Sequence, residues 1–142
     1  MITKILHWAS LITIVIALLL MGYFAYLLWC PFNCVTMLDG HYQTLKTQYH
    51  QGEQLSFRMH YNKHTNLPGR VIRSFEDSIV YQLPSTETNN PKGEQDFINS
   101  SIKIPEFLPI GTYKLKATVI YKVNPFREIS YNMETNNFKV IK

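Results

Sequence analysis

The sequence predicts an all-β sandwich preceded by one membrane-spanning α-helix, and three observations support this. Residues 5–28 form an almost unbroken apolar run. Beyond it, four stretches alternate apolar and polar residues with the period of two expected of strands that bury one face. Glycines and prolines separate these stretches, as in a domain of short strands. We therefore expect residues 1–34 to form an anchor and residues 35–142 to form one domain.

The apolar run has the length of a bilayer span. Trp8 and Trp29 stand at its ends, 21 residues apart, and that separation corresponds to ~32 Å of helix against ~30 Å of hydrocarbon. Tryptophan prefers the membrane–water interface. The run exceeds the roughly 7–15 apolar residues of a cleaved signal peptide, and no small-residue cleavage motif precedes Cys30 or Cys34. The sequence therefore predicts an uncleaved signal anchor.

The distribution of positive charge predicts the orientation of this anchor. Lys4 precedes the apolar run, and the next Lys or Arg is Lys46. Because positive residues stay on the cytoplasmic side, we expect a cytoplasmic N-terminus and a periplasmic or extracellular C-terminal domain.

Small residues recur along one side of the expected helix. Ala9, Thr13 and Ala17 are spaced by four residues, and Ala25 continues the row. This spacing lets a second helix approach closely and predicts a homo-oligomer through the membrane helix. The alternative is that alanine and threonine are ordinary residues of membrane helices.

Cys30 and Cys34 stand where the helix leaves the bilayer, in the run Cys-Pro-Phe-Asn-Cys. Outside the cytoplasm, a disulfide between them would hold the exit turn. Two free thiols and a redox pair are the alternatives, although redox motifs have two residues between the cysteines and this pair has three.

The alternating stretches define which side chains we expect in the core. The inward positions of the first stretch are Leu55, Phe57, Met59 and Tyr61. Those of the third are Ile98, Ser100, Ile102 and Ile104. Those of the fourth are Tyr113, Leu115, Ala117, Val119, Tyr121 and Val123. Residues 79–83 are apolar enough for a central strand, and a fifth run, residues 138–141, closes the chain. Weaker strands are expected at 42–45, 71–75 and 129–133, and residues 84–96 are polar enough for a mobile loop.

The run Leu-Pro-Ile-Gly-Thr-Tyr at residues 108–113 resembles the tyrosine corner of immunoglobulin-like domains. In that corner, a tyrosine near the start of strand F bonds back to the backbone. The resemblance covers residues 39–142 and implies an antiparallel sandwich of about seven strands, with Tyr113 at the corner. Both tryptophans lie at the membrane and no cysteine pair links the sheets, so the domain is similar to bacterial and phage immunoglobulin-like modules without the disulfide.

Composition and motifs argue against several classes of function. Without Lys4, the chain carries 13 basic and 10 acidic residues, a balance too even to indicate nucleic-acid binding. Hydrolase, phosphate-binding and dinucleotide-binding motifs do not occur, and the acidic residues are dispersed. We therefore expect neither an enzyme nor a cofactor.

The histidines offer an alternative function. His60 and His64 are four residues apart, a metal-binding spacing on a helix, but His60 falls in an alternating stretch and His64 in the following turn. With His41 and His50 they would make the chain a metal chaperone or an accessory subunit of a membrane enzyme complex. The simpler expectation is exposed strand and turn histidines.

Two features predict a protein partner instead. Lys114, Lys116 and Lys122 form a basic row on the outward face of the fourth stretch, unless they serve only solubility. Phe126 and Arg127 follow in a loop, where Phe126 would either anchor an interface or fold onto the core. We expect a membrane-anchored binding or assembly protein, of a bacterial envelope or encoded by a phage, whose partners are the lipid bilayer and an unidentified membrane or envelope protein.

Overall fold

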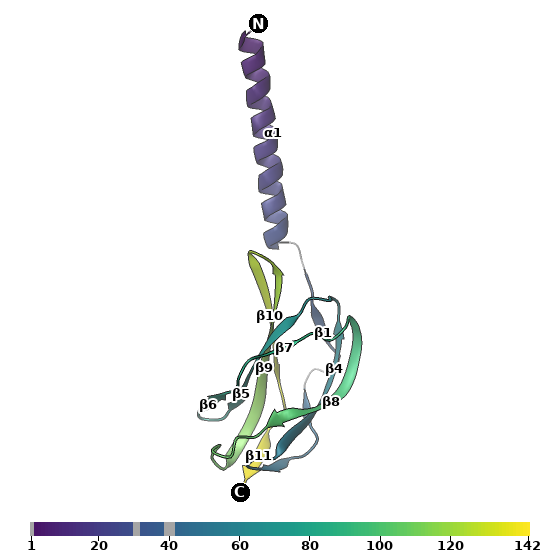
Figure 1. Cartoon of the computed structure of the whole chain (residues 1–142), viewed down its shortest axis with the longest axis vertical. Helices are drawn as coiled ribbons and strands as arrows, with labels where there is room; N and C mark the ends of the chain where they lie inside the picture. Colours follow the sequence, from purple (N-terminus) through teal and green to yellow (C-terminus); the bar gives the residue numbers. More distant parts are fainter. Residues whose placement is uncertain (1, 30–31, 39–41) are drawn as a thin grey trace. The chain divides into compact units, whose positions relative to one another are not determined.

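The computed structural model describes residues 2–29, 32–38 and 42–142 as two compact units. The first unit is Met1–Phe32 with Asn124–Arg127, and the second is Asn33–Val123 with Glu128–Lys142. Helix α1 (Ile2–Trp29) belongs to the first unit, and the β-sheets belong to the second (Figure 1).

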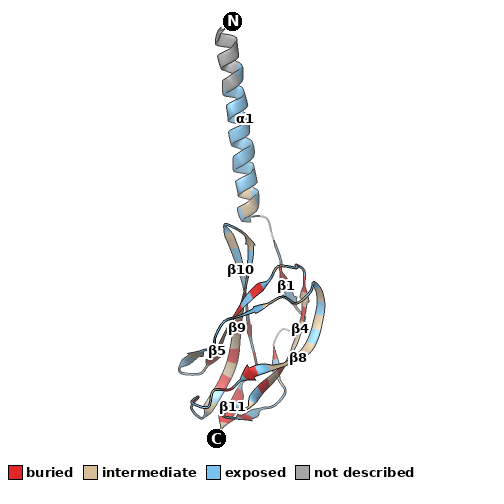
Figure 2. Ribbon diagram, viewed as in Figure 1, coloured by how far each residue is buried: buried red, intermediate tan, exposed pale blue. Residues whose placement is uncertain are grey.

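Helix α1 is 28 residues long, about 42 Å at 1.5 Å per residue. Its segment Ser10–Trp29 has a mean hydropathy of 2.5 with none of it buried, and the ribbon of this segment is coloured mostly as exposed in Figure 2. Pro31 follows two residues after its end, where proline disfavours a further helical turn. By length and composition the helix is able to cross a membrane.

The second unit is an all-β sandwich of two sheets. Its strands are β1 (Val35–Met37), β2 (Gln43–Thr44), β3 (Gln48–His50), β4 (Gln54–Lys63), β5 (Gly69–Glu76), β6 (Val80–Gln82), β7 (Thr86–Thr88), β8 (Gly93–Lys103), β9 (Gly111–Asn124), β10 (Arg127–Glu134) and β11 (Phe138–Ile141).

The first sheet is built around β4. Lys63 of this strand pairs with Val35 of β1 and with Gly93 of β8, so β1 and β8 flank β4 on opposite sides. The short strand β2 pairs with β4 on the β1 side. Strand β8 therefore forms one edge of this sheet, and β1 and β2 form the other.

The second sheet has β9 near its centre and runs in the order β3, β11, β9, β5, β6, with β10 also pairing with β9 and β7 with β5. The chain crosses from the first sheet to the second between β2 and β3. The pairing of β3 with β11 is parallel. Alternation within a strand does not predict this pairing, because β3 and β11 are far apart in the chain.

The core lies between the inward rows of β4 and β9, the residues drawn in red in Figure 2. Leu55, Phe57 and Tyr61 are at most 6% exposed, as the alternation predicts. The inward row of β9 is equally buried: Tyr113, Leu115, Ala117, Val119 and Tyr121. Alternation thus predicts the two long central strands correctly, because each has one face against the core.

The prediction for the third stretch is only half right. Ile102 and Ile104 are buried, but Ile98 is 58% exposed. The reason is a β-bulge: Leu55 pairs with Ile102 and Phe57 with Asn99, so β8 has one extra residue there. An extra residue exchanges the two faces of a strand, and Phe97 and Asn99 face inward in place of Ile98.

Two further predictions are wrong. Residues 79–83 do not form a central strand, because β6 is an edge strand and Ile79 and Val80 are 60% and 61% exposed. The stretch 84–96 is not simply a loop, since it contains β7 and the first residues of β8. In both cases pairing with a neighbour, which the local sequence does not encode, decides the structure.

The hydrogen bond expected at Tyr113 is present. Its hydroxyl donates to the Pro109 carbonyl oxygen at 3.0 Å, and its ring lies edge-on to Tyr81, with centroids 6.3 Å apart. This bond ties the loop before β9 to the start of that strand.

The bulge predicts opposite outcomes for two isoleucines of β8. Ile102→Asn places an amide in the core and should lower the free energy of unfolding by ~3 kcal/mol. Ile98→Asn, on the exposed face, should change it by less than ~0.5 kcal/mol. Unfolding of the full-length variants in detergent, followed by circular dichroism, measures both. Equal losses would contradict the bulge register.

The buried tyrosines predict a loss of stability at alkaline pH. Burial raises the pKa of Tyr121 to about 12, and Tyr61 adds to the rise. Stability from this shift is complete below the pKa of the unfolded chain, ~10, and is lost as pH rises through the folded value. We expect a loss of roughly 1–3 kcal/mol between these pH values, smaller in Tyr121→Phe. An equal pH dependence in both proteins would exclude Tyr121 as the cause.

Candidate functional site

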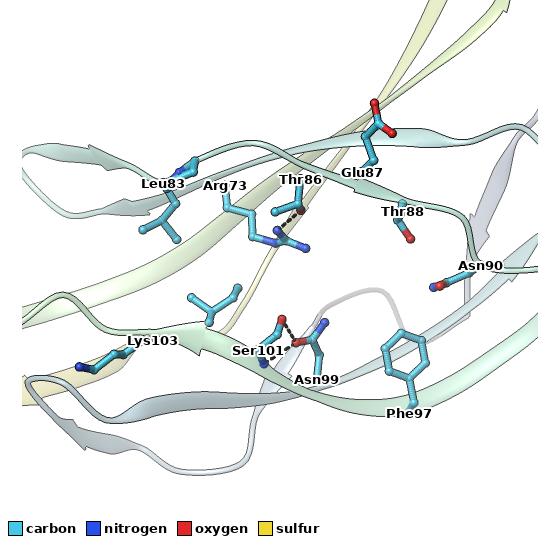
Figure 3. A pocket seen from close by; sticks show the side chains of 12 residues that line it. Arg73, Leu83, Thr86, Glu87, Thr88, Asn90, Phe97, Asn99, Ser101 and Lys103 are labelled. Atoms are coloured by element: carbon cyan, nitrogen blue, oxygen red, sulfur yellow. Dashed lines mark hydrogen bonds between the residues drawn. The ribbon is translucent and has the colours of Figure 1, made fainter.

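A groove opens on the side of the sandwich where the two edge strands β7 and β8 face each other (Figure 3). Its volume is about 540 Å³, within the range of small-molecule and peptide pockets. One wall comes from β5, β7 and Leu83, and the other from residues 97–103 of β8. Arg73, Thr86 and Thr88 point into the gap from one side, and Phe97 and Asn99 from the other, whereas Glu87 points away.

Arg73 is the central charged group of this groove. On β5 it shares the inward face with Val71 and Phe75, which are 5% and 0% exposed, so a cation occupies a core-facing position. Its Nη1 donates to Thr86 Oγ1 at 2.5 Å. Among the residues that the structure describes, no carboxylate forms an ion pair with it. Burial lowers the pKa of the Arg73 guanidinium, which nevertheless stays charged at neutral pH.

The bulge of β8 shapes the opposite wall. Asn99 Oδ1 accepts hydrogen bonds from Ser101 N at 2.9 Å and Ser101 Oγ at 2.7 Å. The hydroxyl oxygens of Ser56 and Ser100 share a hydrogen bond at 2.9 Å. These bonds hold the extra residue in place, so that Asn99 faces the groove in a fixed orientation.

A second inward-facing cation fixes one end of the groove. Lys63 continues the inward row of β4 and is 1% exposed. Its Nζ donates to the Asn90 carbonyl oxygen at 2.6 Å and lies 5.7 Å from the centre of the Tyr121 ring. Asn90 Nδ2 in turn donates to Tyr61 Oη at 2.6 Å. Burial lowers the pKa of Lys63. The hydrogen bond from Lys63 to Asn90 holds the segment that joins β7 to β8.

The chemistry of the groove suits recognition. Arg73 supplies donors for an anion, Thr86, Thr88 and Asn99 supply neutral hydrogen-bonding groups, and Phe97 supplies an apolar surface.

The predicted basic row on β9 carries its own counter-charges. Lys114 Nζ lies 3.1 Å from a carboxylate oxygen of Glu134, and Lys116 Nζ lies 3.6 Å from one of Glu76. Lys122 is exposed beside Arg70 and Glu128. Because two of these three lysines are paired with acids on adjacent strands, the row is less positive than its sequence implies, and its role in partner binding stays a prediction.

Of the two predicted loop residues, Phe126 lies in the turn between β9 and β10, and Arg127 is the first residue of β10. Phe126 is 65% exposed, so the alternative that it folds onto the core is wrong. Its backbone N–H donates to Asn124 Oδ1 at 2.9 Å, which closes the turn. Within the first unit, the Phe126 ring lies 6.1 Å from that of Phe24. Arg127 begins β10 and is half-buried, and partner binding by this pair stays a prediction.

The predicted membrane residues lie on α1. Trp8 and Trp29 are 69% and 82% exposed. Thr13 and Ala17 are exposed and Ala25 is half-buried; Ala9 is in the same helix, but its side chain is outside the described part of the chain. Helix pairing through this row stays a prediction.

The predicted disulfide is untested, because Cys30 lies outside the described residues. Cys34 is wholly buried. Its backbone N–H donates to Tyr131 Oη at 2.7 Å, and that hydroxyl donates to Asn33 Oδ1 at 3.0 Å. These bonds fix where the chain joins the sandwich.

The described histidines make separate contacts. His50 Nδ1 lies 2.5 Å from the Lys142 carbonyl oxygen, His60 Nε2 lies 2.8 Å from a Glu94 carboxylate oxygen, and His64 Nε2 lies 2.8 Å from Thr36 Oγ1. His41 lies outside the described residues. Across residues 2–29, 32–38 and 42–142, no three His, Cys, Asp or Glu side chains are grouped so as to hold a metal ion.

Sequence reasoning missed the groove, although one signal was available. Val71 and Phe75 are four residues apart in an expected strand, so Arg73 between them shares their face, although Ile72 interrupts the apolar–polar alternation. The opposite wall was hidden by the bulge, since strict alternation directs Asn99 outward.

No protein-family model and no curated protein matches this chain.

Lys63 is predicted to order the end of the groove. Lys63→Met removes a stabilising hydrogen bond to Asn90, and it also removes a buried charge that is costly to desolvate. Because these two effects oppose each other, the free energy of unfolding should change by less than ~1 kcal/mol. Asn89, Asn90 and Lys92 should exchange their backbone amide hydrogens several-fold faster, as measured by hydrogen-exchange mass spectrometry of the full-length protein in detergent.

Lys92→Met is the matched control, because Lys92 lies in the same segment and is exposed. Exchange in that variant should equal the wild-type rate. Unaltered protection of residues 89–92 in Lys63→Met would show that this lysine does not hold the segment.

Proposed function

We propose that this chain is a single-pass membrane protein that presents an immunoglobulin-like domain outside the cytoplasm, where the domain binds or assembles with a membrane or envelope protein. The observation that carries the proposal is the exposed apolar segment Ser10–Trp29, with a mean hydropathy of 2.5, followed in the chain by a folded sandwich with an open groove.

The apolar surface of α1 supports insertion in a bilayer. Leu11, Ile14, Leu18 and Leu19 are each more than half exposed. Burial of one such side chain in an apolar medium is favourable by about 1.5–3 kcal/mol, so the whole segment favours the bilayer by a sum on the order of tens of kcal/mol. The positive charge of Lys4, with no further Lys or Arg before Lys46, supports a cytoplasmic N-terminus.

The pairing of the strands supports the immunoglobulin-like type. The first segment of the sandwich pairs, as β1, with β4 in one sheet and, as β3, runs parallel to the last strand, β11, in the other. The bond from Tyr113 to the Pro109 carbonyl oxygen is the one that the tyrosine corner requires. The similarity to bacterial and phage modules without a core disulfide supports an envelope protein of a bacterium or one encoded by a phage.

The character of the groove supports binding as the activity. Its central groups, Arg73, Thr86 and Asn99, are hydrogen-bonding side chains on rigid strands. Loops and edges of a sandwich commonly carry recognition on such a scaffold.

Membrane retention and topology test the anchor. We expect the full-length protein to remain in the membrane pellet after an alkaline carbonate wash. We also expect protease added to spheroplasts to digest the sandwich while the N-terminus stays protected.

A matched pair of variants controls for the role of the apolar segment. Leu18→Arg with Leu19→Arg should release the protein, since each arginine at the centre costs about 2.5–3.5 kcal/mol of insertion. Leu18→Ala with Leu19→Ala should not. A wild-type protein that is soluble, begins after Asn33 in its mature form, or resists external protease would refute the proposal.

A further inference from the structure

Two features at the open side of the sandwich indicate a ligand, and each comes from a different sheet. Arg73 faces inward from β5, donates one hydrogen bond to Thr86, and forms no ion pair with a carboxylate among the described residues. A guanidinium has five N–H donors, so donors remain for an acceptor that enters the groove. A planar carboxylate accepts two of them at once.

The second feature is the edge of β8. This strand is 11 residues long, and in the described part of the chain its only strand partner is β4. On the side away from β4, the backbone of β8 has no partner strand in the described part of the chain, although the Ser101 N–H already donates to Asn99 Oδ1. Such an edge is a template for an added strand.

We infer that the groove binds an extended peptide segment of a partner protein, which pairs with the free edge of β8 and places a carboxylate side chain against Arg73. This inference rests on the proposed binding function and names the part of the domain that performs it. Figure 3 shows the arrangement: the guanidinium lies between the two walls, opposite Asn99.

The walls define what the peptide should look like. An added strand alternates its side chains, so that every second residue faces into the sandwich. If one inward residue is Asp or Glu at Arg73, the inward residues two positions before and after it meet apolar surface, which Phe97, Leu83 and Ile102 provide. The expected motif is an acidic residue with an apolar residue two positions away on each side.

The charge of the groove favours this occupant over a neutral one. Lys103 also lines it, but its Nζ lies 2.9 Å from a carboxylate oxygen of Glu106, and Glu87 points away from the gap. Arg73 is thus the charge that a ligand meets, and its partly desolvated setting strengthens a charge-assisted hydrogen bond.

Peptide selection on the intact protein tests the inference. The probe is a displayed library of random peptides of about nine residues, the length of a strand with its flanks, panned against the full-length chain in lipid nanodiscs. We expect enrichment of the motif above. An enriched peptide should lose about tenfold in affinity when its acidic residue becomes Gln or Asn, and should slow amide exchange in β8.

Two variants locate the effect. Arg73→Gln should remove the acidic preference, so that the enriched peptide and its amide analogue bind equally. Lys103→Gln, in the same groove, should keep the preference. Thermal unfolding of each variant is compared with wild type, and if Arg73→Gln unfolds, Arg73→Lys takes its place. Arg73→Lys retains the charge but not the two-pronged geometry, and should show a reduced preference.

Several results would overturn the inference. Selection without acidic enrichment, or enrichment that survives in Arg73→Gln, would exclude Arg73 as the recognition group. Displacement of the peptide by equimolar free acetate would point to a small carboxylate ligand. Concentration-dependent dimers that protect β8 without peptide would point to a second copy of this chain. Membrane retention is scored separately, so failure here is distinct from failure of the anchored topology.

Discussion

The structure depends on the period-two alternation of β4 and β9, the central strands of the two sheets. Leu55, Phe57 and Tyr61 on β4 meet the inward row of β9, and all are nearly inaccessible to solvent. Every other strand is positioned by pairing with one of these two or with a neighbour of them. A shift of one residue in either strand would place polar side chains such as Arg58 or Lys116 in the core, and the two sheets would lose their common interior.

The groove exists because this core does not close on one side. Strands β7 and β8 are edges of different sheets, and residues that face inward there meet a gap instead of another side chain. Arg73 and Lys63 both occupy inward positions near this gap, where the Thr86 hydroxyl accepts a hydrogen bond from Arg73 and the Asn90 carbonyl oxygen accepts one from Lys63. The same positions in the closed part of the sandwich hold apolar or aromatic residues, because a charge there would have no partner.

The bulge in β8 links the fold to the candidate site. It keeps Ile102 and Ile104 in the core while turning Asn99 and Phe97 toward the groove. A regular strand would have placed Ile98 in the gap and made the opening apolar. Bulges commonly redirect side chains near functional sites, and here one extra residue, held by the Asn99–Ser101 hydrogen bonds, determines the polarity of a whole wall.

The sequence alone determined the apolar helix, the β-class of the domain and the inward rows of β4 and β9, because those features repeat along a continuous segment with one period. It also indicated the bond made by Tyr113, since the residues that form that corner are adjacent. Only the tertiary structure decided that residues 79–83 lie at an edge, that residues 84–96 contain strands, and that Arg73, Asn90 and Asn99 share one groove. Those outcomes depend on pairing between segments far apart in the chain and on one inserted residue that reverses the alternation, and neither leaves a local periodic signal.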